Sequence, residues 1–166
     1  MLAILFSAAV ALAGDPSRCI PLPRSYAPLV EEWDGPRNAP VEGRRDALAA
    51  LDQLLAALEA RGHPAVVASG YRSYDQQEHL YAREQQLWGR PVNLPPGCSQ
   101  HQLGTAFDLA FPGLVLESAD PRAIALRQAI VELAPAYGFA VPYTEGSSLA
   151  PEPWHVVYVG LNEASQ

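Results

Sequence analysis

The chain has 166 residues, 49% of them hydrophobic and 17% charged, which suits one globular domain and excludes intrinsic disorder. Its formal net charge is −7, and all 11 basic residues are arginines. Because no basic cluster is dense enough to follow a phosphate backbone, we predict no nucleic-acid partner.

The first thirteen residues, 1–13, form an apolar run that ends in Ala11-Leu12-Ala13. This pattern is typical of the apolar region and cleavage site of a secretory signal peptide, although no Lys or Arg precedes the run. The run is shorter than the ~20 apolar residues that a membrane span needs, so we predict no stable span after its removal. We therefore expect a protein secreted to the periplasm or cell envelope. The alternative is a buried N-terminal segment.

The predicted elements begin after an irregular, proline-rich N-terminal arm at residues 14–42. Leucines at helical spacing predict an amphipathic helix from Arg44 to Arg61, which Gly62 ends. Residues 65–68 have the composition of a short buried strand. A second helix is predicted from about Tyr74 to Trp88.

Residues 89–98 are rich in proline and glycine and are predicted to form a loop, whereas residues 106–111 are strand-like. The dipeptide Asp120-Pro121 provides an N-cap and a first turn for a third helix, which Gly138 ends. Residues 156–159 form the last predicted strand. Helices and short strands mix without regular βαβ alternation, so we predict a single α+β domain with a central, largely antiparallel sheet and flanking helices.

The two cysteines, Cys19 and Cys98, lie in the arm and in the predicted loop. In an oxidising compartment such a pair forms a disulfide, which would tie the arm to the loop before Ser99. The alternative is two free thiols, because sequence alone does not determine cysteine connectivity. Cys98 is also close enough to His101 to bind a metal, but a fourth protein ligand would close the site, so we favour the disulfide.

The segment Ser99–Asp108 reads SQHQLGTAFD, with His101 and Asp108 seven residues apart and Gly104 between them. A bend at Gly104 would bring the two side chains around one ion, and imidazole nitrogen and carboxylate oxygen both bind zinc. Taken alone, such a pair more often consists of surface residues or makes a local hydrogen bond.

A second candidate, Glu152-Pro153-Trp154-His155, runs into the last predicted strand. Pro153 argues against a helix, and in an extended chain Glu152 and His155 would lie on opposite faces. A bend at Pro153 would instead let His155 reach the metal while Glu152 addresses a water molecule. The alternative is an edge strand with a chance Glu and His.

Together these motifs resemble the signature of the zinc D-Ala-D-Ala peptidases, the D,D-carboxypeptidases and D,D-dipeptidases known from vancomycin resistance. The matching positions are Ser99, His101, Gly104, Ala106 and Asp108, followed by Glu152, Trp154 and His155. Residues 69–73, with the sequence SGYRS, and Gln77 match the upstream motif of this family. The three motifs follow in the family's order, and the resemblance implies the hedgehog/D,D-peptidase-like fold.

The resemblance implies one Zn2+ per chain, held by His101, Asp108 and His155 with a fourth position open to water. It implies that Glu152 is the general base, which takes a proton from the attacking water and later delivers it to the departing amine. Arg72 is similar to the family arginine that stabilises the oxyanion or the peptide carbonyl. The alternative for Arg72 is a solvated arginine just before a helix.

Three residues are candidates for substrate binding: Arg72, Ser99 and Gln77. Ser99 resembles a position that contacts substrate or supports the ligand loop, and its alternative is a turn or cap hydroxyl. Gln77 would either support Arg72 or lie on the outside of its helix.

The resemblance implies hydrolysis of a peptide bond next to a D-amino acid in peptidoglycan stem peptides. Residues 152–160 resemble the carboxypeptidase branch most, so we predict a monomeric D-alanyl-D-alanine carboxypeptidase with its catalytic domain at residues 43–166. Its partner would be a stem peptide or a precursor ending in D-Ala-D-Ala. The alternatives are a dipeptidase, an L,D-carboxypeptidase, a peptidoglycan endopeptidase or a non-catalytic cell-wall binding module. We favour an enzyme because both Glu152 and Arg72 are present.

Overall fold

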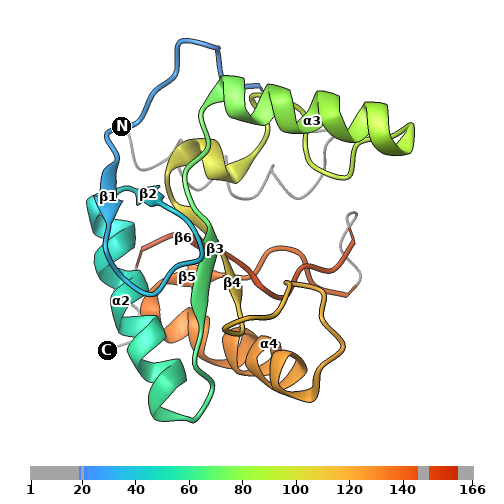
Figure 1. Ribbon diagram of the computed structural model, residues 1–166. Helices are drawn as coiled ribbons and strands as arrows, with labels where there is room; N and C mark the ends of the chain where they lie inside the picture. The colour runs from blue at the N-terminus through green and yellow to red at the C-terminus, as the bar shows by residue number, and fades with distance from the viewer. Residues whose placement is uncertain (1–18, 20, 146–149, 161–166) are drawn as a thin grey trace.

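The computed structural model describes Cys19, residues 21–145 and residues 150–160, and the predicted signal peptide lies outside this part of the chain. A four-stranded antiparallel sheet has the order β3 (Val66–Ser69), β4 (Ala106–Ala110), β6 (His155–Tyr158) and β5 (Phe139–Ala140) (Figure 1). A smaller sheet pairs β1 (Glu31–Trp33) with β2 (Val41–Gly43). Within the described residues the helices are α2 (Arg45–Ala60), α3 (Tyr74–Trp88) and α4 (Pro121–Leu133), with 3-10 helices η2 (Gln100–Leu103) and η3 (Ala134–Tyr137). The predicted α+β fold is confirmed.

The hydrophobic core joins the four-stranded sheet to helices α2 and α4. The leucines whose spacing predicts α2 are all buried, namely Leu48, Leu51, Leu54, Leu55 and Leu58. They belong to one cluster with Phe107 and Leu109 of β4 and with Val156 of β6. Because burial of one leucine side chain contributes about 2 kcal/mol, this face of α2 fastens the helix to the sheet.

Helix α3 is held by capping and by buried polar side chains rather than by an apolar face. Ser73 and Gln76 form a capping box at its start, and Gly89 ends it in the left-handed conformation at φ 71°. Its buried side chains are Gln77 and Glu84. Both are hydrogen-bonded to the loop that follows, so α3 and this loop form one unit.

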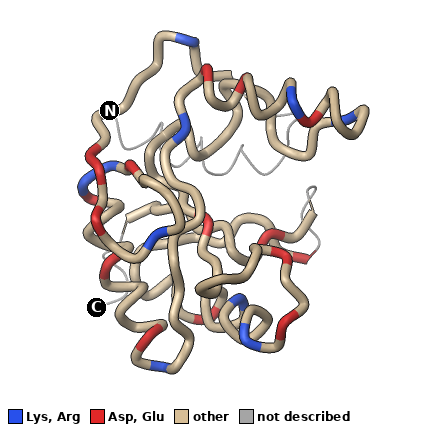
Figure 2. Tube along the Cα trace, in the orientation of Figure 1, with Lys and Arg blue, Asp and Glu red and all other residues tan. Residues whose placement is uncertain are grey.

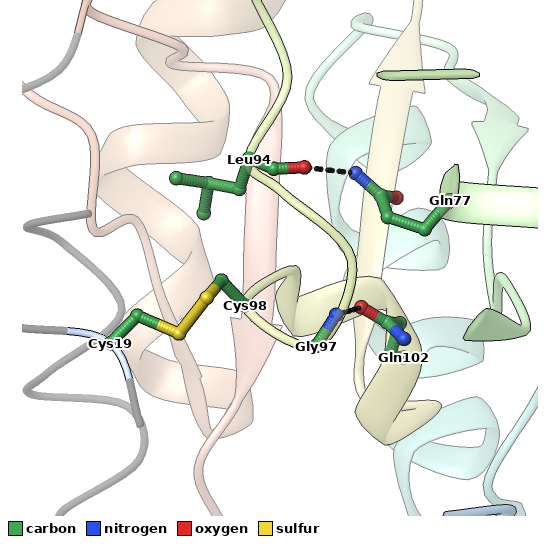
Figure 3. The surroundings of a disulfide bond; sticks show 6 residues. All are labelled: Cys19, Gln77, Leu94, Gly97, Cys98 and Gln102. Carbon is green, nitrogen blue, oxygen red and sulfur yellow. Dashed lines mark hydrogen bonds between the residues drawn. A yellow bond between two sulfur atoms is a disulfide. The ribbon is translucent and has the colours of Figure 1, made fainter. Parts of the chain in front are cut away.

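Polar contacts and a disulfide hold the loop at residues 89–98 (Figure 3). Gln77 donates its amide to the Leu94 carbonyl at 2.7 Å, and Gln102 accepts from the Gly97 amide at 2.7 Å. The disulfide joins Cys98 to Cys19 of the arm, 79 residues earlier. In the chain-entropy model a cross-link across such a separation stabilises the folded state by about 4 kcal/mol.

A short pair of strands lies where the sequence predicts an irregular arm. β1 and β2 flank a turn region rich in proline and glycine, and Trp33 and Val41 at their ends are buried in the core. The Trp33 indole also donates to Asp52 of α2 at 2.9 Å. Strands of three residues are too short to show alternation, which explains why the sequence pattern does not indicate them.

Charged residues are distributed over the whole of the described chain. Figure 2 shows arginines on the arm, on α2, α3 and α4, and on loops rather than on a single element. Several pair with acidic side chains, as Arg61 does with Glu132 at 2.6 Å. Among the described residues, no helix combines the length and the apolarity needed to cross a bilayer.

Candidate active site

The register of the sheet brings Asp108 and His155 together. Asp108 of β4 lies directly opposite His155 of β6, and Ser69 of β3 lies opposite Asp108 on its other side. Side chains alternate across a strand, so Phe107 and Leu109 enter the core while Asp108 points to the other face. Residues directly opposite each other share a face, and Asp108 Oδ1 lies 2.9 Å from His155 Nδ1.

His101 reaches the same point from η2 because the chain turns sharply at Gly104. Gly104 has φ 71°, and a Cβ there would lie 2.9 Å from the Val30 side chain, so both conformation and space require glycine. The turn sets His101 Nε2 at 3.2 Å from Asp108 Oδ2. The other ring nitrogen, Nδ1, is 2.7 Å from the Gly70 carbonyl oxygen. The bend expected at Gly104 is therefore present.

A tight turn sets Glu152 beside His155. The His155 amide donates to the Glu152 carbonyl at 3.0 Å, which closes a four-residue turn with Pro153 in its second position. The Glu152 amide donates to the Tyr143 carbonyl at 2.8 Å, which anchors the start of the turn. Both side chains line one cleft, so the bend expected at Pro153 is also present.

The ligand atoms of His101, Asp108 and His155 all lie within 4.8 Å of one another, and the three residues are buried. Burial lowers the pKa of His101 to about 4, so this imidazole is neutral at pH 7. Burial alone would raise the pKa of Asp108, but the two imidazoles hold it well below its usual range. Two imidazoles and a carboxylate are a donor set that zinc prefers, and three protein ligands leave a fourth position open.

The cleft above these ligands has a volume of about 420 Å³. Its lining residues include the three candidate ligands together with Arg72, Ser99 and Glu152. Burial raises the pKa of Glu152 above its ordinary value; Asp108 adds to this rise, whereas His155 and Arg72 oppose it. The carboxyl group is thus better able to hold a proton than a solvated glutamate would be.

Arg72 is a cleft residue rather than a solvated one. Its Nη1 donates to Asn93 Oδ1 at 3.3 Å, and Asn93 is itself held by the buried carboxylate of Glu84. Burial lowers the pKa of Arg72, but an arginine stays protonated in proteins. Its Nε is buried and has no hydrogen-bond partner among the described residues. A fixed cation with spare donor capacity is suited to an oxygen of a bound ligand.

Ser99 and Gln77 have different positions. Ser99 is 6% exposed, lines the cleft and precedes η2 without capping it through its side chain. Gln77 is fully buried and outside the cleft lining, because its face of α3 is turned toward the loop at Leu94. It therefore neither lies on the outside of its helix nor hydrogen-bonds Arg72 directly.

Two further residues at the site were not identified from the sequence as functional. Gln100 and Tyr143 line the cleft, and the Tyr143 hydroxyl lies 3.1 Å from Gln100 Oε1. The same oxygen is 2.9 Å from His155 Nε2. Burial raises the pKa of Tyr143 well above its usual range, so its hydroxyl remains protonated. Gln100 is flanked by Ser99 and His101, which is a signal that sequence reasoning could have used, but Tyr143 lies in no motif.

Two histidines and an aspartate that open on a cleft with a glutamate and an arginine form the arrangement of open, catalytic zinc sites. The family model described as VanY, D-alanyl-D-alanine carboxypeptidase, matches residues 41–161. Since this match covers most of the chain, the protein belongs to the VanY family.

Curated relatives resemble the same part of the chain. The chain is 37% identical over 100 residues to a D-alanyl-D-alanine carboxypeptidase of Enterococcus faecium, and this match covers 58% of the chain and 30% of that protein. It is 32% identical over 131 residues to YodJ of Bacillus subtilis, which covers 73% of this chain and 48% of YodJ. The chain thus spans less than half the length of these two relatives.

Solved structures share the fold. The LD-carboxypeptidase LdcB superposes with a TM-score of 0.73 at 29% identity, covering 84% of this chain and 72% of that chain. A vancomycin-resistance D,D-pentapeptidase, VanY, in complex with Zn(II), superposes with a TM-score of 0.67 at 26% identity. That match covers 85% of this chain and 84% of the VanY chain.

Proposed function

We propose that this protein is a zinc peptidase that cleaves a peptide bond next to a D-amino acid in peptidoglycan stem peptides, and that its main activity is that of a D-alanyl-D-alanine carboxypeptidase. One observation carries this proposal: the cleft gathers the three ligand residues together with Glu152 and Arg72. Family membership supports the substrate class.

We assign one Zn2+ per chain to His101 Nε2, Asp108 and His155 Nδ1. The residues fit this ion because each histidine turns one nitrogen toward Asp108 while an oxygen atom contacts its other nitrogen. When bound, zinc would act as a Lewis acid that polarises the scissile carbonyl and lowers the pKa of water.

Glu152 acts as the general base and then as the general acid. It takes a proton from the attacking water as the new C–O bond forms, and returns it to the amine as the C–N bond breaks. Its raised pKa suits this exchange, because a base with a pKa closer to the working pH can both accept and release the proton. The turn at Pro153 keeps the carboxyl group beside the ligand His155.

Arg72 binds the carbonyl oxygen of the scissile bond and stabilises the negative charge that develops there. Its contact with Asn93 fixes the guanidinium, so little conformational entropy is lost when substrate binds. Ser99, at the edge of the ligand loop, contacts the substrate or supports this loop. Gln77 acts indirectly, because it holds the loop that carries Asn93 and Leu94.

A second candidate is L,D-carboxypeptidase activity on the same site, which the fold shared with LdcB favours. Cleavage by either activity would require a stem peptide that enters the cleft by its C-terminal end. We also propose that residues 1–13 are a signal peptide, that residues 43–166 form the catalytic domain after the N-terminal arm, and that the monomer acts in the cell envelope.

The test is mass spectrometry of a synthetic stem pentapeptide ending in D-Ala-D-Ala, incubated with the zinc-loaded protein and, separately, with its Glu152→Ala variant. Loss of one terminal alanine with the parent protein alone would support the carboxypeptidase assignment. A tetrapeptide shortened while the pentapeptide survives would instead assign the L,D-carboxypeptidase. If both peptides and cross-linked muropeptides survive, the protein is a binding module rather than a peptidase.

A further inference from the structure

His101 and His155 are held by different kinds of acceptor. The Nδ1 of His101 contacts the backbone carbonyl of Gly70 at 2.7 Å, and the position of this carbonyl is fixed by the backbone. The Nε2 of His155 contacts the side-chain oxygen of Gln100 at 2.9 Å. The orientation of His155 therefore depends on a side chain that is itself able to rotate.

The metal site requires this acceptor. His155 turns Nδ1 toward Asp108, at 2.9 Å from Oδ1, so Nδ1 is the nitrogen that would bind a metal. A neutral imidazole bound through Nδ1 carries its proton on Nε2, and a ligand histidine almost always donates this N–H to an oxygen acceptor. Among the described residues, Gln100 Oε1 is the acceptor in contact with Nε2.

Gln100 is held in place by its surroundings. It is 2% exposed, and its Oε1 also lies 3.1 Å from the Tyr143 hydroxyl, which donates to it. The Tyr143 ring packs on the His155 ring, with centroids 5.0 Å apart. One oxygen atom thus accepts one hydrogen bond from the tyrosine and one from the histidine, which fixes the amide and the imidazole relative to each other.

The side-chain amide of Gln100 leaves one buried polar atom without a hydrogen bond. The Nε2 of Gln100 is buried and has no hydrogen-bond partner among the described residues. A leucine or methionine of similar size would avoid that unsatisfied donor, and unsatisfied buried groups of this kind are expected at functional positions. The contact made by Oε1 accounts for the presence of glutamine.

We propose that Gln100 is a positioning residue for the metal site: its Oε1 accepts a hydrogen bond from the Nε2–H of His155, which favours the tautomer with the lone pair on Nδ1 and directs Nδ1 at the ion, while Tyr143 holds the amide. The inference rests on the zinc site proposed above. It identifies a residue that acts through His155 and touches neither the metal nor the reacting atoms.

The experiment compares the zinc affinity of variants of Gln100 and of Tyr143 with that of the parent protein. Gln100→Leu removes the acceptor and should weaken zinc binding by about 10- to 100-fold, the usual effect of losing such a partner. Gln100→Glu keeps an acceptor oxygen and should restore the affinity to that of the parent protein or better. Tyr143→Phe keeps the ring, removes the hydroxyl and should weaken binding a few-fold.

The matched control is Gln102→Leu. Gln102 lies in the same 3-10 helix, is 3% exposed and also accepts one buried hydrogen bond, but from the Gly97 amide rather than from a ligand. The Gln102→Leu variant should lose about as much folding stability as Gln100→Leu. Its zinc affinity should stay within about twofold of that of the parent protein, since no proposed ligand loses a hydrogen-bond partner.

Affinity is measured by competition with a chromophoric chelator, and the absorption spectrum of the Co2+-substituted protein reports ligand geometry independently of activity. Thermal unfolding of each metal-free variant establishes that it is folded.

Equal zinc affinities for Gln100→Leu and Gln102→Leu would overturn the inference. It would also be overturned if Gln100→Glu bound zinc as weakly as Gln100→Leu. Should Gln100→Leu not fold, Tyr143→Phe provides the test. Weaker zinc binding with an altered Co2+ spectrum would support the inference, whereas unchanged affinity with an unaltered spectrum would overturn it. Failure of the parent protein to bind zinc would instead overturn the proposed function.

Discussion

Asp108 and His155 face each other across strands β4 and β6, and their Oδ1 and Nδ1 atoms lie 2.9 Å apart although 47 residues separate them in the sequence. Two of the three proposed ligand residues thus lie on neighbouring strands of a sheet whose other face is packed against the core. A site built on paired strands is held more rigidly than one built on loops. The third proposed ligand, His101, reaches the same point through the turn at Gly104.

Substitution of a proposed ligand and substitution of the proposed base should have different effects. His101→Ala and His155→Ala should lose the metal, because two remaining ligands do not form a zinc site. Glu152→Ala should keep zinc near one per chain and lose turnover of a D-Ala-D-Ala peptide, since the proposed mechanism uses its carboxyl group as the base. Metal content by mass spectrometry and peptide hydrolysis are measured on the same preparations. Full activity in Glu152→Ala would disprove its assigned role.

Arg72→Lys should lower kcat/KM by about 100-fold, because lysine cannot supply the forked donor geometry of the guanidinium to a developing oxyanion. Zinc content should not change, since Arg72 is not a ligand. Arg83→Lys, at an exposed position on α3, is the control and should retain full activity. Equal activity of the two variants would place Arg72 outside the catalytic machinery.

The metal-free protein should lose stability as the pH falls from 6.5 toward 4. Burial lowers the pKa of His101 from 6.5 to about 4, so the unfolded chain binds a proton first and is favoured throughout that window. At pH 4 this linkage amounts to about 3 kcal/mol of unfolding free energy. Below pH 4 the depressed pKa of Asp108 adds a further loss in the same direction.

Urea unfolding of the chelator-treated protein at pH 7, 5.5 and 4 measures this dependence. His101→Asn should flatten the curve between pH 6.5 and 4, whereas His79→Asn, at an exposed position, should leave it unchanged. A curve for His101→Asn as steep as that of the parent would assign the acid sensitivity to other groups.

Two glycines with the same backbone conformation should respond differently to alanine. Gly104 and Gly89 both have φ 71°, but a Cβ at Gly104 would lie 2.9 Å from Val30 Cγ1, whereas nothing lies within 4 Å at Gly89. Gly89→Ala should cost about 1 kcal/mol for the left-handed conformation alone. Gly104→Ala should cost more and also weaken zinc binding, because the clash displaces the turn that carries His101. Similar losses in the two variants, with zinc affinity unchanged, would contradict this.

The secondary structure followed from local patterns. Leucine spacing predicts α2, and the N-cap residue Asp120 marks the start of α4. These signals are local because a helix makes its hydrogen bonds within a few residues of chain. The pair β1 and β2 gave no such signal, since three-residue strands are stabilised by burial of Trp33 and Val41 rather than by their own pattern.

The sequence by itself determined the family, because the residue types and spacing around His101, Asp108 and His155 match its signature, and from this it predicted the metal ligands. Only the tertiary structure decided which nitrogen of each histidine faces Asp108, that Gln100 and Tyr143 contact His155, and that Gln77 holds a loop instead of lining the cleft. The physical reason is that strand register and side-chain hydrogen bonds join residues tens of positions apart. Such contacts depend on how the whole chain packs, and no local pattern encodes them.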